Sequence, residues 1–303
     1  MKQTVTGHTR VTWLVALLVA TVALPMSPAA SADPAEALRQ RYVDLQPQLS
    51  DNVYQRPLYL DSTDADGSTR GEVYVVVQHP FKRVVNALAS ADHWCDILIL
   101  HVNTKYCRPA AEATGARVLH VAMGRKFEQD LDDAYRVDFG FRVLHSDRRL
   151  LQVELDSPEG PMGTRDYRIQ LEAVPLNLTQ TFIHLSYAYS YGVTARLAMQ
   201  TYLATMGNSK VGFTVVRHND AGEPEYIGGV RGAVERNTLR YSLAIEAYLG
   251  ALSTVPGDQM DKRLRDWFAA TERNPLQLHE MELDEYLTMK HKEVRRQQEP
   301  IDE

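Results

Sequence analysis

A run of alternating apolar and polar residues between positions 116 and 191 constrains this chain more than any other feature. Five segments carry the period-two pattern of half-buried β-strands, at residues 116–123, 135–146, 150–156, 164–174 and 181–191. The breaks at 146–148 and 157–163 are rich in turn-forming residues and too short to hold a crossover helix. Consecutive strands must therefore pair antiparallel, and the pattern predicts a meander.

Other elements surround the meander. Residues 72–78 are β-branched and aromatic, which predicts a strand, and residues 81–91 place apolar side chains on one helical face. Residues 61–71 are rich in Asp, Ser, Thr and Gly and predict an exposed loop. The remaining expectations are a peripheral helix at 34–45, a strand at 211–218, and helices at 193–205, 233–252, 260–271 and 276–296.

The first 32 residues have the three parts of a secretory signal peptide. Lys2 and Arg10 supply positive charge, residues 11–24 form an apolar run, and small residues end the segment at Ala32. The apolar run is shorter than the ~20 residues that a membrane-spanning helix needs, which favours cleavage over an uncleaved anchor. We therefore expect a soluble protein located in the periplasm or secreted.

Two cysteines, Cys95 and Cys107, follow the signal peptide and would both reach an oxidising compartment, where thiols tend to pair. A disulfide is the simplest interpretation. Two buried free thiols are the alternative, because spacing alone does not establish a geometry that can be bridged. A metal site is not expected, because the two cysteines do not form a Cys-x-x-Cys pattern.

The net charge of −6 argues against nucleic acid as a partner, because phosphate binding relies on clustered Lys and Arg. The sequence also lacks the motifs of a serine-hydrolase nucleophile elbow, a phosphate-binding loop and a zinc protease. No catalytic residue and no cofactor is therefore assigned from sequence.

The order of a strand, a helix, a meander and a long helix resembles the START-like or SRPBCC superfamily. Two stretches carry the local resemblance: residues 81–107, FKRVVNALASADHWCDILILHVNTKYC, and residues 160–167, GPMGTRDY. The resemblance implies Trp94 at the end of the first helix and a hairpin turn before Tyr167. We include both residues among the candidate ligand contacts.

The same resemblance implies an α+β helix-grip fold, in which a curved antiparallel sheet wraps around a long C-terminal helix and leaves a cavity between them. Residues 233–252 are our choice for that helix, with additional helices after it. We expect an N-terminal helix and loop at 33–70, a helix-grip domain at 71–255 and a helical extension at 256–303.

His101, Asn103 and Lys105 alternate along the chain and would share one face of a strand. That face could supply polar contacts to the head of a ligand. The alternative is an exposed polar face, which is the default for a sheet that is covered on one side.

Tyr187, Tyr189 and Tyr191 also alternate, and phenol rings with polar tips suit a pocket for an amphipathic ligand. Core packing is the alternative, because aromatic strands are common on that ground alone. Arg236 and Arg240 lie one helical turn apart. They could bind an anionic head group, or pair with carboxylates such as Asp166 in a structural role.

The leading functional hypothesis is the binding or transfer of a lipid or another hydrophobic small molecule in the periplasm, with transient contact to a membrane. One alternative is an enzyme of the same superfamily, cyclase-like or hydrolase-like, using His101, Asp96 or Tyr189 as acid or base. Another is an envelope interaction protein that docks through its C-terminal helices.

Overall fold

The computed structural model describes residues 1–4, 33–65, 67–205 and 210–298. Nearly all of the predicted signal peptide lies outside the described residues, so it stays a prediction. The main sheet consists of β1 (Leu58–Ala65), β2 (Ser68–Val77), β3 (Thr104–Ala111), β4 (Arg117–Met123), β5 (Tyr135–Ser146), β6 (Leu151–Glu159), β7 (Thr164–Pro175) and β8 (Thr181–Tyr191). All five strands of the predicted meander form.

These eight strands pair antiparallel in the order β1-β2-β8-β7-β6-β5-β4-β3. Strands β3 to β8 follow one another as the meander, and β8 then pairs with β2 from the beginning of the sheet. Strand β2 comes directly before β3 among the strands of the sequence, but the two lie near opposite ends of the sheet. The chain must therefore cross from one end of the sheet to the other between β2 and β3. Two helices make that crossing, α3 (Phe81–Leu88) and α4 (Ala91–Leu98).

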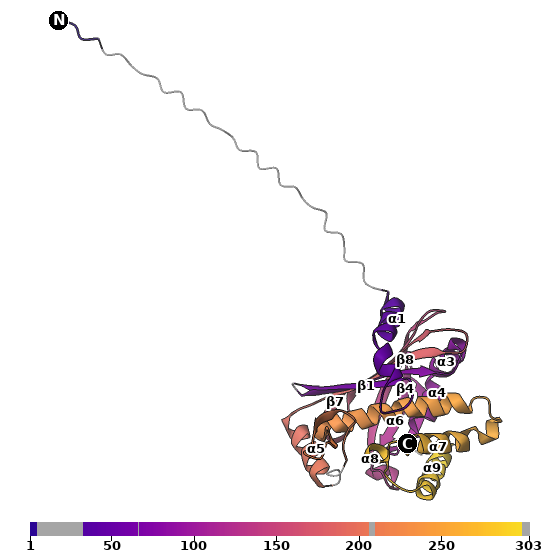
Figure 1. The fold of residues 1–303 in the computed structure, drawn as a ribbon. Helices are drawn as coiled ribbons and strands as arrows, with labels where there is room; N and C mark the ends of the chain where they lie inside the picture. Colours follow the sequence, from indigo (N-terminus) through magenta and orange to yellow (C-terminus); the bar gives the residue numbers. More distant parts are fainter. Residues whose placement is uncertain (5–32, 66, 206–209, 299–303) are drawn as a thin grey trace. The chain divides into compact units, whose positions relative to one another are not determined.

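A long helix, α6 (Gly229–Ala251), lies along one face of the sheet and contacts β1, β2 and β8 (Figure 1). Its approach to the sheet is close at Gly71 in β2, where a Cβ atom would collide with the Thr238 hydroxyl oxygen. The helix is buried on nearly every side because α4 and α7 (Gln259–Thr271) pack against it away from the sheet. An antiparallel sheet around this helix confirms the predicted α+β helix-grip fold.

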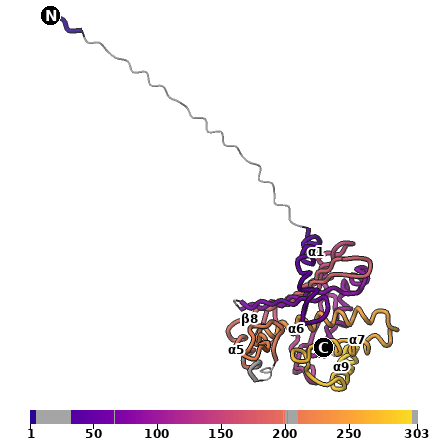
Figure 2. Tube along the Cα trace, in the orientation of Figure 1, coloured from indigo at the N-terminus to yellow at the C-terminus, as the bar shows by residue number. Residues whose placement is uncertain are grey.

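The opposite face of the sheet is covered by α1 (Pro34–Asp44) and α2 (Gln46–Ser50), as Figure 2 shows for α1. Alternate residues of β2 explain the two layers, since Val73, Val75 and Val77 face the main core whereas Tyr74 and Val76 pack with the N-terminal helices. The predicted helix at 34–45 therefore forms and covers a second, smaller core.

Three local predictions are wrong. Residues 61–65 and 68–71 belong to strands β1 and β2 rather than to a loop, because antiparallel strands can carry polar residues on a face that is open to solvent. The helix expected at 81–91 ends at Leu88, and the extended backbone of Ser90 starts α4, so Trp94 lies inside a second helix. His101 and Asn103 lie in a turn, because β3 begins only at Thr104.

The remaining elements follow β8. They are α5 (Val193–Thr205), the hairpin of β9 (Val215–His218) and β10 (Pro224–Tyr226), a short 3-10 helix at Pro256–Asp258, α8 (Pro275–Leu278) and α9 (Leu283–Gln298). Two more 3-10 helices lie within the meander, at Leu131–Asp133 before β5 and at Pro161–Gly163 before β7. The helix predicted at 276–296 is thus divided between α8 and α9. Helix α7 packs on α6 and α9 rather than on the sheet, with Trp267 stacked against Tyr286.

Cys95 in α4 and Cys107 in β3 form a disulfide, with their Cα atoms 5.1 Å apart. This confirms the predicted pair, and the alternative of two free thiols is wrong. The bridge fixes α4 to the far edge strand of the sheet, next to the turn that carries His101. Among the described residues, no helix is both long enough and apolar enough to cross a membrane. The domain boundaries at residues 70 and 255 stay predictions.

Candidate functional site

A cavity of about 430 Å³ lies between α6 and the sheet, where the helix-grip fold predicts one. We call it the grip cavity. Its volume falls within the ~300–1,000 Å³ of typical small-molecule sites. It is lined by His101, Asn103, Met123, Gly124, Arg125, Lys126, Gln129, Asp133, Tyr135, Pro161, Met162, Thr164, Tyr167, Tyr187, Tyr189, Met199, Ala233, Arg236, Asn237, Arg240 and Tyr241.

Seven of the nine candidate ligand contacts named from sequence line this cavity: His101, Asn103, Tyr167, Tyr187, Tyr189, Arg236 and Arg240. The other two have internal partners. Trp94 is buried in α4 and its indole N–H donates to the Leu88 carbonyl oxygen at 2.8 Å. Lys105 is buried at the start of β3 and pairs with Glu293 at 3.1 Å. Whether the seven residues bind a ligand stays a prediction.

Four tyrosines form one wall of the grip cavity. Tyr167 and Tyr189 stack with their ring centres 5.1 Å apart, and Tyr187 lies 5.3 Å from Tyr241 of α6. Alternation along β8 puts Tyr187 and Tyr189 on the same face, as the sequence predicted. Burial raises the pKa of all four phenols, so the wall is uncharged at neutral pH. Tyr191 is buried outside the lining, and its hydroxyl donates to Asp64.

Arg240 belongs to a compensated charge cluster. Its guanidinium donates to the Glu280 carboxylate at 2.5 Å and to the Leu278 carbonyl oxygen at 3.2 Å. Lys126 pairs with the second oxygen of Glu280 at 2.7 Å. Burial lowers the pKa of Lys126 to about 8 although Glu280 opposes the shift. Asp166, the partner suggested from sequence, instead lies exposed beside Arg165 in an irregular part of β7, so that prediction is wrong.

Arg236 has no such compensation. Its Nη1 donates to the Val211 carbonyl oxygen at 3.1 Å, and within the described part of the chain it forms no ion pair with a carboxylate. The neighbouring Glu235 is turned away, accepting hydrogen bonds from the Ser62 hydroxyl and the Phe213 N–H at 2.5 Å each. Burial and the charge of Arg240 lower the pKa of Arg236 to about 10, which leaves it charged at neutral pH.

His101 presents a neutral imidazole at the cavity. Its Nδ1 accepts the backbone N–H of Asn103 at 3.1 Å, which assigns the proton to Nε2. Burial, together with Arg240 and Lys290, holds the pKa of His101 well below its usual value. The buried Nε2 has no hydrogen-bond partner of good geometry among the described residues, although the nearby Asn237 side chain opposes part of the fall in the pKa of His101. Asn103 fixes the turn by donating its side-chain N–H to the Gly124 carbonyl oxygen at 2.7 Å.

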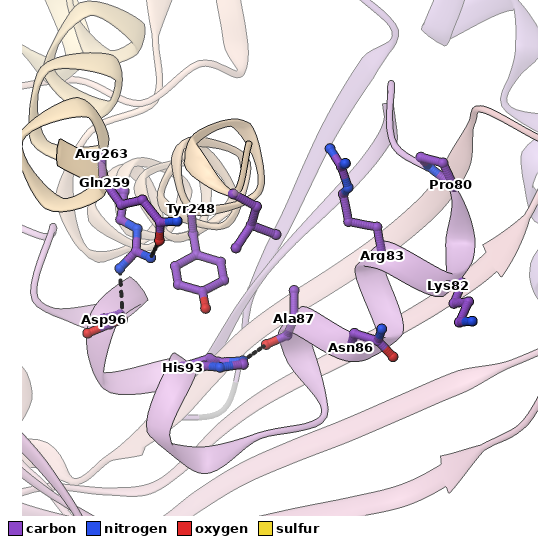
Figure 3. Close-up of a pocket in the computed structure, with 11 residues that line it drawn as sticks. Pro80, Lys82, Arg83, Asn86, Ala87, His93, Asp96, Tyr248, Gln259 and Arg263 are labelled. Carbon is purple, nitrogen blue, oxygen red and sulfur yellow. Dashed lines mark hydrogen bonds and ion pairs between the residues drawn. The ribbon is translucent and has the colours of Figure 1, made fainter. Parts of the chain in front are cut away.

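Figure 3 shows a second, more open pocket, of about 660 Å³, between α3, α4, the end of α6 and α7. Asp96 lies here, not in the grip cavity, and pairs with Arg263 at 2.7 Å. The same guanidinium stacks over the Tyr248 ring at 4.3 Å. The lining is Pro80, Lys82, Arg83, Asn86, Ala87, His93, Asp96, Tyr248, Leu252, Gln259 and Arg263. Because Arg263 and Asp96 neutralise each other, we take the grip cavity as the candidate site.

No protein-family model and no curated protein matches the chain. Among solved structures it is similar to norcoclaurine synthase from Thalictrum flavum, at 14% identity and a TM-score of 0.31 over 50% of this chain and 83% of that one. The aromatase/cyclase Zhui from Streptomyces sp. R1128 matches at 14% identity and 0.29, over 78% and 96%. Human StAR-related lipid transfer protein 5 matches at 9% and 0.30, over 57% and 89%. The fold class rests on the strand order and on the position of α6.

Sequence reasoning missed several residues of the cavity. Asn237 and Tyr241 lie four residues apart on α6, the spacing that places side chains on one helix face, so helical periodicity could have found them. Lys126 follows β4 in an irregular segment, and Glu280 lies between α8 and α9. No local pattern marks either residue, because their pairing depends on how the C-terminal helices fold back onto the cavity.

Proposed function

We propose that the mature protein binds or transfers a hydrophobic small molecule in the grip cavity. The observation that carries this proposal is a cavity between α6 and the sheet that is walled by four buried tyrosines. The apolar faces of the phenol rings favour a ligand with a flat or chain-like apolar body. Burial of that body contributes about 25 cal/mol of binding free energy per Å² of apolar surface, before the costs of association are subtracted.

We place this activity in the periplasm or outside the cell. The N-terminal sequence has the parts of a signal peptide, and the Cys95–Cys107 disulfide suits an oxidising compartment. Transfer would also involve transient contact with a membrane. Val193 and Leu197 support this part of the proposal, because they are exposed on α5, the helix that contacts the 3-10 turn at the rim of the cavity.

The arrangement favours binding over the two alternatives. Of the three acid–base candidates, Asp96 lies in the second pocket, and His101 and Tyr189 have pKa values shifted away from neutrality. The C-terminal helices bury their large aromatic residues Trp267 and Tyr286, which leaves those side chains unavailable for docking to a partner.

Fluorescence titration with N-phenyl-1-naphthylamine, a neutral apolar probe, tests the proposal. We expect saturable binding at one site per chain. Replacing Ala233, which lines the cavity on α6, by Phe should fill the space and abolish binding. Ala269→Phe, at an exposed position of α7, is the matched control and should bind like the wild type.

Native mass spectrometry of the protein purified from its own cells should in addition show a retained apolar ligand in the wild type and not in Ala233→Phe. Absence of both probe binding and a retained ligand in the folded wild type would overturn the proposal. Equal binding of the probe by the wild type and Ala233→Phe would overturn the assignment to the grip cavity.

A further inference from the structure

Arg236 carries a positive charge in a place where charge is costly. The residue is 4% exposed, and its one hydrogen bond to a described residue is made to a backbone carbonyl. Its Nε is buried without a partner. Burial of an ion without a counter-ion is strongly unfavourable, and proteins normally place a carboxylate beside such a group. A missing carboxylate therefore calls for an explanation.

Among the described residues no carboxylate forms an ion pair with Arg236, although Glu280 and Glu235 act on its charge from a greater distance and favour the charged form, which opposes the fall in its pKa. Lys126, Arg236 and Arg240 bring three cations to one end of the grip cavity, and Glu280 is the carboxylate that pairs with two of them. Among the described residues, Glu280 therefore leaves a surplus of positive charge at this end. Asp133, the carboxylate in the lining, is exposed at the rim, where water screens it.

We propose that the ligand of the grip cavity carries an anionic group, a carboxylate, sulfonate or phosphate, and that Arg236 binds it. This inference rests on the proposed function, since it specifies what the cavity holds. A guanidinium presents a planar fork of donors that matches such groups. The tyrosine wall takes the apolar body, so the ligand class is an amphipathic anion.

His101 fits the same group. Its Nε2–H is a neutral donor without a partner among the described residues, and its ring lies 4.9 Å from Tyr241, next to the tyrosine wall. Arg240 is a weaker candidate, because Glu280 and the Leu278 carbonyl oxygen already accept from it. The Nε of Arg240 is also buried without a partner, but Glu280 already compensates its charge, so Arg236 and His101 are the residues we assign to the anion.

A pair of probes with the same body separates this inference from the proposed function. 8-Anilinonaphthalene-1-sulfonate is the sulfonated form of the neutral N-phenyl-1-naphthylamine. We expect the wild type to bind the sulfonate more tightly than the neutral probe. Arg236→Gln should weaken the sulfonate by roughly ten- to hundred-fold, the loss of a charge-assisted contact, and change the neutral probe less than two-fold.

Two further variants serve as controls. Arg236→Lys keeps the charge and should recover part of the sulfonate affinity. Arg231 lies on the same helix, but its guanidinium donates to Ser62 and does not line the cavity. Arg231→Gln should therefore leave the affinities for both probes unchanged. Near-UV circular dichroism verifies that each variant is folded, because the sulfonate probe also binds loosely packed states.

Competition identifies the chemistry of the natural ligand. Decanoate should displace the sulfonate probe, whereas decanol and inorganic phosphate should compete much less, since one lacks the charge and the other lacks the apolar body. Unchanged sulfonate affinity in Arg236→Gln would overturn the inference, as would a wild type that prefers the neutral probe, while the proposed function would stand. A folded wild type that binds neither probe and retains no ligand would overturn both.

Discussion

Replacing Glu293 by Gln should destabilise the protein by about 3–5 kcal/mol, the cost of breaking a buried ion pair from one side. Glu293 in α9 is 2% exposed and accepts from Lys290 at 2.7 Å and from Lys105 at 3.1 Å. Both ammonium groups are fully buried. Their other bonds to oxygen go to backbone carbonyls of the turn at 101–104, at 2.7–2.9 Å, so the Glu293→Gln variant would leave two charges without a carboxylate contact.

Deprotonation of the lysines limits this cost and gives it a pH dependence. Burial already lowers the pKa of Lys290 to about 8 and lowers that of Lys105. A lysine whose pKa is lower in the folded state binds fewer protons there than in the unfolded chain, so stability rises with pH between the two values. Loss of Glu293 lowers the folded pKa values further. The deficit of Glu293→Gln should therefore be largest at low pH, shrink as pH rises from the variant's lower folded pKa towards about 8, and stay constant above that value.

Urea unfolding followed by tryptophan fluorescence measures the loss in the free energy of unfolding. In thermal unfolding, Tm should fall by roughly 10 °C. Glu285→Gln, on the exposed face of the same helix, is the matched control and should change stability by no more than about 0.5 kcal/mol. A change below about 1 kcal/mol in Glu293→Gln, or a deficit that does not vary with pH, would refute the view that this carboxylate compensates two buried charges.

Two other predictions concern different parts of the fold. His184 lies between Glu172 and Glu72 at 3.1 Å from each, and although burial opposes it, these carboxylates raise its pKa. The stabilisation from His184 is complete below its unfolded pKa of about 6.5 and is lost as pH rises through its folded pKa. Urea unfolding of His184→Gln should therefore show a stability that varies less with pH from about pH 5 to 8 than that of the wild type. An unchanged pH dependence would contradict this. The double variant Cys95→Ser/Cys107→Ser opens a loop of sequence separation 12 and should lose about 3 kcal/mol in thermal unfolding without reductant, and stability equal to the wild type would show that the bridge does not constrain the unfolded chain.

Local patterns predicted the sheet well and the connections poorly. The five meander strands carry a period-two sequence pattern, which located them. In β5 and β7 that pattern corresponds to alternating burial, whereas β8 is buried along almost its whole length. Two predictions failed at segments whose structure depends on pairing elsewhere in the fold. Residues 61–65 and 68–71 are strands because β1 and β2 pair at the sheet edge, and residues 101–103 form a turn before β3, where Lys290 of α9 donates to the carbonyl oxygens of His101 and Thr104.

The candidate site shows the same division. Tyr187 and Tyr189 could be predicted to share a face because strand geometry requires it. Arg236 and Arg240 could be predicted to share a helix face, yet their opposite electrostatic situations could not. A carboxylate 40 residues further along the chain compensates one and not the other, and only the folded arrangement of α8 and α9 decides which.

The C-terminal helices are part of the charge balance of the helix-grip fold. Glu280, between α8 and α9, pairs with Lys126 and Arg240 beside the grip cavity. Glu293, in α9, pairs with Lys105 under the turn that borders the same cavity. Two buried cations, Lys105 and Arg240, and the partly buried Lys126 thus depend on carboxylates that follow α6 in the sequence. Removing the extension at 256–303 would expose these cations to solvent or leave them without a carboxylate partner. The helix-grip domain and the extension should therefore unfold in one transition.

This dependence on carboxylates from the C-terminal segment bears on the interpretation of Arg236. The segment after α6 already supplies Glu280 to Lys126 and Arg240 and Glu293 to Lys105. The same segment could in principle supply a carboxylate to Arg236. Arg236 forms no ion pair within the described part of the chain, although it lies on the same helix as Arg240 and one turn from it. The simplest physical account is that its partner enters with the ligand, because an internal carboxylate at this position would compete with an anionic ligand for the same guanidinium.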